Sequence, residues 1–245
     1  MKSDDAAFLA KLVELGLYSN PRTLAVYLDS FLGDTRFEGR TVLDIGGGAG
    51  LFTFVAAQRG ARKAVLLEPV LSGSTPGITE RFRARAEALG LADRTELAVA
   101  TIQSYEPGEL RFDVALSAAS INHWDEPACV DAHRSPEARA TYVAVLRRLY
   151  DMMNPGADLI VSDAARRNLF GDLGLRNPLA PTIEWHKHQS PHFWASLCAE
   201  AGFARPSVSW TTYNTLGRLG ARIMNNPLAA YLTLSTFRYA MVRPA

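Results

Sequence analysis

The amino-acid sequence predicts an α/β fold in which helices cover both faces of a mostly parallel sheet. The clearest sign lies in residues 41–52, where a short apolar run ends in an acid and leads through a glycine-rich turn into an amphipathic run. Beyond this unit, short apolar runs alternate with longer amphipathic runs. Strands that alternate with helices in this way are joined by crossover connections and lie parallel in an open sheet. We therefore expect three layers, with the sheet in the middle.

Length, charge and cysteine content narrow the class of protein. A chain of 245 residues forms one large domain, or a domain with a small appendage, and needs no disulfide or metal for a full core. The net charge is +1 and no long block of like charge occurs, so neither a nucleic-acid partner nor a membrane surface is expected. The two cysteines lack a C-x-x-C pattern, and the sequence shows neither a signal peptide nor a membrane-spanning apolar run. These features predict a cytoplasmic protein with reduced thiols.

The spacing of the glycines indicates what kind of ligand the turn holds. Asp44, Gly46, Gly48 and Gly50 read D-x-G-x-G-x-G, a turn in which the backbone bends sharply and approaches a ligand without Cβ atoms in the way. The dinucleotide fingerprint G-x-G-x-x-G/A, begun at Gly46, would place the bulky Leu51 where a third glycine allows close packing of helix and strand. The spacing therefore argues against a dinucleotide.

This loop resembles the first motif of class I S-adenosylmethionine-dependent methyltransferases. A second buried strand, over 63–67, ends at Glu68, and in that family an acid at this place accepts hydrogen bonds from both ribose hydroxyls. After the third strand the family often has an acid for the adenine amino group, whereas this chain offers Thr101 or Gln103. The resemblance implies S-adenosyl-L-methionine as the cofactor. The cofactor-binding residues that it implies are Asp44, Gly46, Gly47, Gly48, Gly50, Glu68, Pro69, Thr101, Ile102, Gln103 and Ser117.

The same resemblance implies a Rossmann-like methyltransferase fold, with a seven-stranded, mostly parallel sheet and an antiparallel last strand. Two predicted helices, over 4–15 and 19–33, precede the first strand and are too small for a core of their own. We expect residues 1–38 to form a helical cap on a methyltransferase domain over 39–245. The remaining predicted strands cover 96–99, 112–117, 159–163, 206–212 and 235–242, and the remaining helices cover 51–58, 76–89, 142–153, 191–201 and an insertion at 213–232, with a turn at 154–156.

Three histidines are candidates for a catalytic base. His123 follows the fourth predicted strand, and ligands of open sheets bind at the carboxyl ends of the strands. His186 and His188 lie in 164–192, a long polar segment that we interpret as a substrate lid. A neutral imidazole can take a proton from an attacking hydroxyl or amine near neutral pH.

Two other interpretations of these histidines stay open. The H-x-H spacing would place the imidazoles of His186 and His188 on one side of an extended segment, where they could bind a metal together with Asp163 or His123. Alternatively, the histidines only pack and form hydrogen bonds within the loop. The positive charge of Lys187 argues against a metal, so we favour the general base and predict no metal.

The substrate class follows from motifs that the sequence lacks. The signatures of the related DNA, ring-carbon and protein-arginine enzymes do not occur, so the resemblance implies a small-molecule acceptor that is methylated at oxygen or nitrogen. Arg166 or Arg167 could clamp a carboxylate or phosphate of such a molecule. Two other functions remain, a non-catalytic S-adenosylmethionine-binding protein and an NAD-dependent oxidoreductase, which shares the strand, the glycine turn and the acid. A homodimer is also compatible with the sequence.

Overall fold

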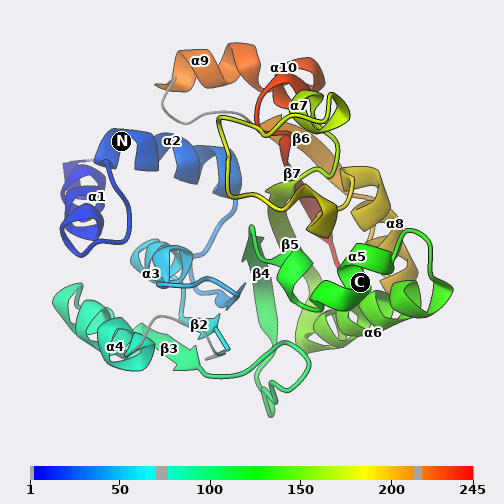
Figure 1. The fold of residues 1–245 in the computed structure, drawn as a ribbon. Helices are drawn as coiled ribbons and strands as arrows, with labels where there is room; N and C mark the ends of the chain where they lie inside the picture. The colour runs from blue at the N-terminus through cyan, green and yellow to red at the C-terminus, as the bar shows by residue number, and fades with distance from the viewer. Residues whose placement is uncertain (1–2, 70–76, 212–216, 245) are drawn as a thin grey trace.

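A seven-stranded sheet forms the centre of the protein in the computed structural model, which describes residues 3–69, 77–211 and 217–244 (Figure 1). The strands are β1 (Thr41–Ile45), β2 (Lys63–Leu67), β3 (Thr95–Ala98), β4 (Phe112–Ala118), β5 (Met153–Ala164), β6 (Ser207–Thr211) and β7 (Thr236–Val242). Their order is β3-β2-β1-β4-β5-β7-β6, and β7 runs antiparallel to both of its neighbours while the other strands are parallel. The predicted mostly parallel sheet with an antiparallel last strand is confirmed.

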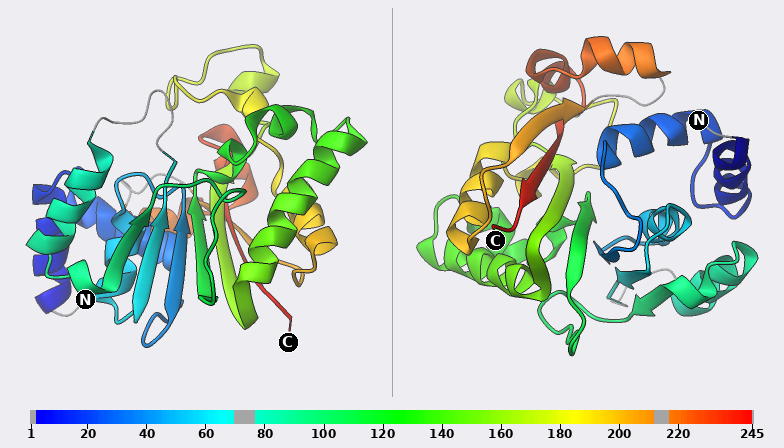
Figure 2. Two further views of the ribbon diagram at one scale, coloured as in Figure 1. Left: turned by 90° about the horizontal axis from the view of Figure 1, so that it is seen from below. Right: turned by 180° about the vertical axis from the view of Figure 1, so that it is seen from behind.

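Helices cover both faces of this sheet (Figure 2). One face carries α1 (Ser3–Glu14), α2 (Pro21–Leu32), α3 (Leu51–Gln58) and α4 (Ile78–Ala88), and the other carries α5 (Glu126–Asp131), α6 (Pro136–Met152) and α8 (Pro191–Ala201). Phe31 of α2 meets Phe52 of α3 with ring centroids 4.5 Å apart. On the other face, the ring centroids of Tyr142 in α6 and Trp194 in α8 lie 5.0 Å apart. One apolar cluster on each face of the sheet therefore fixes the predicted three layers.

The two N-terminal helices share the apolar cluster of α3 and α4 and do not form a core of their own. Leu12 of α1 and Leu24 of α2 are fully buried in the same cluster as Phe54 of α3. Helix α2 begins where the side chain of Asn20 accepts hydrogen bonds from two backbone N–H groups of the first turn, with Pro21 as the first helical residue. The cap and the packing together hold α2 above the sheet.

Helix α6 begins at Pro136, earlier than the predicted Tyr142. The Ser135 side chain accepts a hydrogen bond from the backbone N–H of Ala138 (3.1 Å) and so caps the helix. Proline fits the first turn because its missing N–H has no partner there in any case. The apolar stripe that guided the prediction begins one turn and more after this cap, because the first turns of α6 face solvent.

Strand β5 is longer than predicted, and the expected turn at 154–156 is wrong. These residues belong to β5, which begins at Met153 beside Phe112 of β4. The register between the two strands shifts before the next pair, so the Asn-Pro-Gly sequence forms an irregularity within the strand. Gly156 has a φ of +78°, which a glycine adopts without strain. The predicted start of the helix before β3, Pro76, lies outside the described residues.

Short helices lie between the longer elements and were missed because they span too few residues for a periodic pattern. They are η1 (Ala92–Arg94), η2 (Ile121–His123), α5, α7 (Leu169–Asp172) and η3 (Trp185–Lys187). The insertion contains α9 (Gly217–Met224) and α10 (Pro227–Leu232), while its residues 213–216 lie outside the described ranges. Among the helices of the described part of the chain, none is long and apolar enough to cross a membrane.

Candidate functional site

The glycine loop joins β1 to α3 and is shaped by its backbone. The N–H of Gly46 donates to the carbonyl of Leu67 (2.7 Å), and the N–H of Gly48 donates to Oε2 of Glu68 (2.8 Å). Gly46, Gly48 and Gly50 all have positive φ, and a Cβ on Gly50 would lie 2.8 Å from the ring of Phe82. The loop therefore needs glycine for its backbone conformation and, at Gly50, for close packing as well.

Asp44, near the end of β1, holds this loop and the start of α3 together. Its side chain is fully buried, and Oδ2 accepts hydrogen bonds from the backbone N–H (3.0 Å) and the hydroxyl (2.8 Å) of Thr53 in the first turns of α3. A Cβ on Gly47 would overlap the carboxylate, so only glycine fits over it. Burial raises the pKa of Asp44 from 3.8 to about 7, since a charged carboxylate is poorly solvated there. Asp44 thus ties the turn to the helix.

Glu68 offers an acceptor beside the loop. Its carboxylate is about half buried, which raises its pKa, while the hydrogen bond from Gly48 acts in the opposite direction. Within the described residues, Oε1 has no hydrogen-bond partner, and space is open above Gly48, where an added Cβ would meet nothing within 4 Å. An acceptor oxygen next to an open glycine turn fits a ribose with two hydroxyls. Pro69 follows at once, and residues 70–76 lie outside the described ranges.

The other predicted cofactor residues hold neighbouring loops. Ile102 is buried, and the side-chain amide of Gln103 donates to the carbonyl of Trp124 (2.5 Å), while Thr101 forms a hydrogen-bonded turn with Ser104. Ser117 is fully buried at the end of β4. Its hydroxyl lies 2.7 Å from that of Ser120, which in turn donates to the carbonyl of Ile45 (2.6 Å), so the ends of β4 and β1 are joined.

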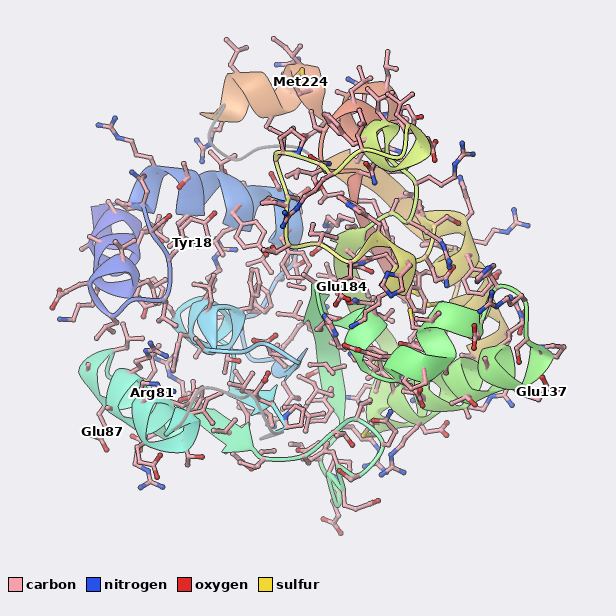
Figure 3. All side chains as sticks on the ribbon, viewed as in Figure 1. Tyr18, Arg81, Glu87, Glu137, Glu184 and Met224 are labelled. Carbon is pink, nitrogen blue, oxygen red and sulfur yellow. The ribbon has the colours of Figure 1, made fainter. Side chains whose placement is uncertain are left out.

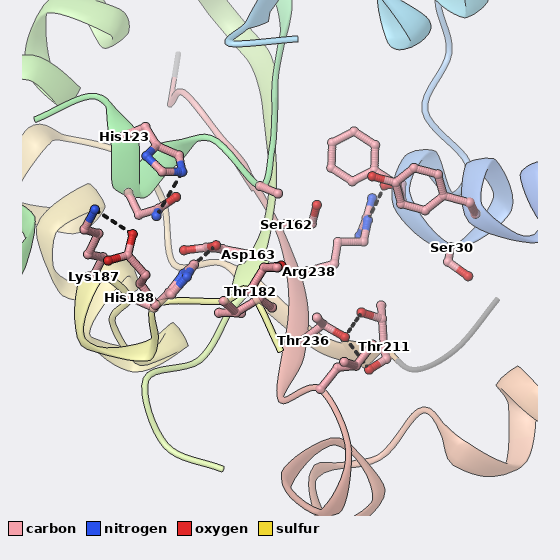
Figure 4. A pocket seen from close by; sticks show the side chains of 18 residues that line it. Ser30, His123, Ser162, Asp163, Thr182, Lys187, His188, Thr211, Thr236 and Arg238 are labelled. Carbon is pink, nitrogen blue, oxygen red and sulfur yellow. Dashed lines mark hydrogen bonds and ion pairs between the residues drawn. The ribbon is translucent and has the colours of Figure 1, made fainter. Parts of the chain in front are cut away.

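A cavity of about 410 Å³ lies beyond the ends of β4 and β5 (Figure 4). Helix α2 contributes Tyr27, Ser30 and Phe31, η2 after β4 contributes His123, and the end of β5 contributes Ser162 and Asp163. Thr211, Thr236 and Arg238 of β6 and β7 close one side. The polar 164–192 segment closes another with Thr182, Ile183, Glu184, Lys187 and His188. Figure 3 places Glu184 of this segment near the middle of the molecule. The volume and the mixed polar and aromatic walls suit a small organic molecule.

The structure separates the three predicted histidines. His188 lines the cavity with its Nδ1 3.0 Å from Oδ1 of the buried Asp163. His123 also lines the cavity, but its Nδ1 faces Glu126 (2.5 Å) and its Nε2 lies 3.4 Å from the amide of Asn122. His186 is exposed and does not reach the cavity, because η3 turns it outward. The extended segment that would align His186 with His188 is therefore not present.

Lys187 adds little net charge to the cavity. Its Nζ lies 2.7 Å from Glu184 and 3.1 Å from Glu126, and these partners raise its pKa. Hydrogen bonds from His123 and Lys187 lower the pKa of Glu126 in return. The ammonium is therefore surrounded by two carboxylates and joins the 164–192 segment to α5.

The two arginines predicted to clamp an anion lie elsewhere. Arg166 and Arg167 line a second pocket of about 450 Å³ at the start of α8, where Arg166 contacts His133 (3.2 Å) and Arg167 pairs with Asp172 (2.8 Å). Arg238 was missed, although it stands on the cavity wall. The signal in the sequence was a basic residue between the apolar residues of an otherwise alternating strand. In the described ranges, His, Cys, Asp and Glu side chains nowhere gather in threes as a metal site requires.

The sheet order, the glycine loop and the acid after β2 together define a Rossmann-like methyltransferase. A family model described as a methyltransferase domain matches residues 20–206, which is most of the chain. The protein therefore belongs to this family of methyltransferase domains, whose methyl donor is S-adenosyl-L-methionine. A comparison with curated proteins found no match.

Solved structures share the fold at low identity. An O-methyltransferase family 2 protein from Planctomyces limnophilus DSM 3776, in complex with apigenin, has a TM-score of 0.56 and 17% identity over 99% of this chain and 62% of that chain. The N,N-8-amino-8-demethyl-D-riboflavin dimethyltransferase (RosA) from Streptomyces davawensis has a TM-score of 0.58 and 19% identity over 96% of this chain and 56% of that chain. This chain thus spans less than two thirds of either methyltransferase.

A third structure shows that the fold does not determine the reaction. The [4+2]-cyclase SpnF has a TM-score of 0.57 and 14% identity over 91% of this chain and 80% of that chain. Identities this low establish a common fold alone. The reaction has to be argued from the site.

Proposed function

We propose that the protein transfers the methyl group of S-adenosyl-L-methionine to an oxygen or nitrogen of a small-molecule acceptor, and that His188 is the general base. The observation that carries this proposal is the pair of His188 and the buried Asp163 on the wall of the acceptor cavity. The near-neutral net charge and the size of the cavity favour a small molecule over a nucleic acid.

The geometry favours His188 over the other two histidines. The carboxylate of Asp163 accepts a hydrogen bond from the Nδ1–H of His188, and this tautomer leaves the lone pair of Nε2 for the acceptor. His123 has both ring nitrogens in contact with protein groups, and His186 lies outside the cavity. Of the three, His188 therefore has the fixed tautomer and the location that a base requires.

The protein's part in the reaction is to position the acceptor and to remove a proton. S-adenosyl-L-methionine supplies a methyl group that is already activated on a sulfonium sulfur. The methyl carbon would exchange its bond to sulfur for a bond to the acceptor oxygen or nitrogen, which leaves S-adenosylhomocysteine. His188 would take the proton from that acceptor atom, and Asp163 would stabilise the imidazolium. Tyr27 and Phe31 cover the cavity with aromatic surface and so restrict water and the orientation of the acceptor.

The alternatives predict different binding and turnover. An NAD-dependent oxidoreductase of the dinucleotide-binding fold has the strand order 3-2-1-4-5-6 without an antiparallel strand between the last two, which differs from this sheet. A non-catalytic protein would bind S-adenosyl-L-methionine without needing a base in an adjacent cavity. The His188–Asp163 pair therefore favours an enzyme.

A titration followed by a turnover assay tests the proposal. We expect S-adenosylhomocysteine to bind in a calorimetric titration at micromolar concentration, and NADH, in parallel, not to bind. Labelled S-adenosyl-L-methionine with a panel of small phenols, hydroxy acids and amines should then yield a methylated product. Binding of NADH alone, or no methyl transfer to any member of a broad panel, would contradict the proposal.

Matched variants test the base. His188→Gln should lower kcat for the best acceptor about 10²- to 10⁴-fold and leave the affinity for S-adenosylhomocysteine unchanged. His186→Gln, two residues away and outside the cavity, is the control and should keep full activity. A large loss with His123→Gln but not with His188→Gln would assign the base to His123.

A further inference from the structure

Arg238 is a half-buried cation that pairs with no carboxylate of the described residues. Its Nε donates to the carbonyl of Phe31 (2.6 Å), and this is its one side-chain hydrogen bond among the described residues. Burial lowers its pKa, while the charge of Asp34, too distant for an ion pair, acts in the opposite direction. By contrast, Arg40 pairs with Asp158 (2.6 Å) in a further pocket, of which Arg238 also forms part of the wall. Both terminal nitrogens of Arg238 thus lack a hydrogen-bond partner among the described residues, although one of them lies beside Gly33, and a partly buried cation gains from such a partner.

The sheet brings Arg238 and the proposed base to the cavity from opposite faces. Arg238 stands opposite Ser162 in the β5–β7 ladder, and the next pair is Asp163 with Phe237. Side chains alternate between the faces of a sheet, so Arg238 lies on the face of α2, while Asp163 lies on the other face with His188. All of these except Phe237 line the same cavity (Figure 4). A molecule bound in this cavity, beyond the ends of the strands, can contact the base and the guanidinium at the same time.

Arg238 makes the α2 side of the cavity suitable for one negative charge, while Asp163 keeps the His188 side negative. Lys187 is already compensated by Glu126 and Glu184, so Arg238 supplies the one uncompensated positive charge among the described lining residues. Two terminal N–H groups of a guanidinium match the two oxygens of a carboxylate. A phosphate dianion would place a second negative charge near Asp163 and Glu184 with no cation to balance it.

We propose that the acceptor carries a carboxylate, that Arg238 binds this group, and that the atom to be methylated lies at the His188 end of the cavity. This inference rests on the proposed methyl transfer for its second half only. Recognition of the carboxylate needs no reaction and can be measured by binding. Arg238 then determines which acceptors enter, whereas His188 acts on the atom that reacts.

The test compares carboxylates with their neutral carboxamides in the presence of S-adenosylhomocysteine. The probes are benzoate, 3-hydroxybenzoate, 4-hydroxybenzoate and 3,4-dihydroxybenzoate, each titrated beside its carboxamide and beside phenyl phosphate. We expect the wild type to bind at least one acid about tenfold or more tightly than its amide, which is the range of a charge-assisted hydrogen bond. Phenyl phosphate should bind more weakly than benzoate.

Variants of Arg238 complete the test. Arg238→Met should remove the preference for the acid, and Arg238→Lys, which keeps the charge and a donor for Phe31 but loses the planar fork, should retain part of it. The control is Arg139→Met, which removes an arginine that pairs with Glu200 between α6 and α8. Thermal unfolding of each variant checks that it is folded. If Arg238→Met does not fold, the acid preference of Arg238→Lys is the test of the proposal.

Three results would overturn the inference: no acid preference in the wild type, the same preference in folded Arg238 variants, or tighter binding of phenyl phosphate. The two proposals fail separately. Methylation of neutral acceptors with no acid preference would refute the role of Arg238 and leave the methyl transfer standing. An acid preference that depends on Arg238, without methylation of any panel member, would support recognition and argue against the reaction.

Discussion

Two neighbouring parts of the site, both at the carboxyl ends of the parallel strands, are built in different ways. At the ends of β1 and β2, the site consists of backbone: glycine N–H groups, a turn with positive φ, and one carboxylate that holds the turn. At the ends of β4, β5 and β7, the site consists of side chains from α2, the 164–192 segment and the C-terminal strands. The first part is contiguous in the sequence, and the second is assembled from segments far apart.

Because of this difference, the two parts tolerate substitutions to different extents. A side chain added at Gly47 or Gly50 collides with Asp44 or Phe82, so the proposed cofactor side tolerates few residues at these two positions. The acceptor side presents hydroxyls, an arginine and a histidine on a fixed frame, and each can change without altering the turn. A fold in which one part of the site tolerates few substitutions and the other tolerates many can retain its cofactor while its substrates change.

The largest effect should come from the buried carboxylate on the acceptor side. In Asp163→Asn, the amide donates to Nδ1 of His188, so the proton moves to Nε2 and the base is lost. We expect kcat to fall about 10³-fold, within the usual range for a positioned base, with little change in KM or in S-adenosylhomocysteine affinity. Asp158→Asn, in the same strand but away from the cavity, is the control. An unchanged kcat would remove Asp163 from the catalytic arrangement.

The buried carboxylate on the cofactor side should act on stability instead. The pKa of Asp44 is about 7 in the folded protein against 3.8 ordinarily, so the folded state holds this proton more tightly than the unfolded state. Its contribution to stability is therefore full below about pH 4 and is lost as the pH rises through about 7. At about 1.4 kcal/mol per pKa unit, the loss is on the order of 4 kcal/mol. Asp44→Asn lacks this titration, so its stability relative to the wild type should rise between pH 5 and 8 in urea unfolding; equal pH slopes would contradict the prediction.

Two adjacent glycines should differ in how they tolerate alanine. Gly47→Ala places a methyl group on the Asp44 carboxylate and should cost about 1–3 kcal/mol of unfolding free energy, together with most of the S-adenosylhomocysteine affinity. Gly48→Ala meets open space and carries only the strain of its positive φ, about 1 kcal/mol. Urea unfolding and calorimetric titration of both variants measure this difference. A larger loss of stability in Gly48→Ala would mean that sterics do not limit the turn.

The smallest effect should be on cofactor affinity alone. Glu68→Gln loses the charge but keeps an acceptor for Gly48, and should weaken S-adenosylhomocysteine binding roughly tenfold, as expected for one charge-assisted hydrogen bond. Glu68→Ala should weaken it further. Glu96→Gln on β3, whose carboxylate pairs with Lys63 at the surface, serves as the control. Unchanged affinity in both Glu68 variants would move the ribose contact to another residue.

The sequence predicted those parts of the molecule that depend on nearby residues. Asp44, the glycines and Glu68 lie in one β–loop–α–β unit, so their spacing alone indicated the turn and its acid. The strand ends and most of the helices followed from apolar periodicity in the same way.

Contacts between distant segments could not be predicted in this manner. Arg238 reaches the cavity because β7 inserts between β5 and β6, and no spacing in the sequence connects it with Asp163. His186 and His188 are candidates on the same grounds in the sequence, but the short η3 turns His186 outward and leaves His188 in extended backbone beside the sheet. A turn of three residues is too short to leave a periodic signal.

The position of β7 also bears on how the chain assembles. This last strand pairs with β5 on one side and β6 on the other, and β7 is the one neighbour of β6 among the strands of the described residues. During synthesis, the segments that form β1 to β4 leave the ribosome long before β7. Until β7 is in place, the apolar edge of β5 stays unpaired and open to other chains. The acceptor side is thus completed last, and chaperone dependence and aggregation should be governed by the C-terminal strand.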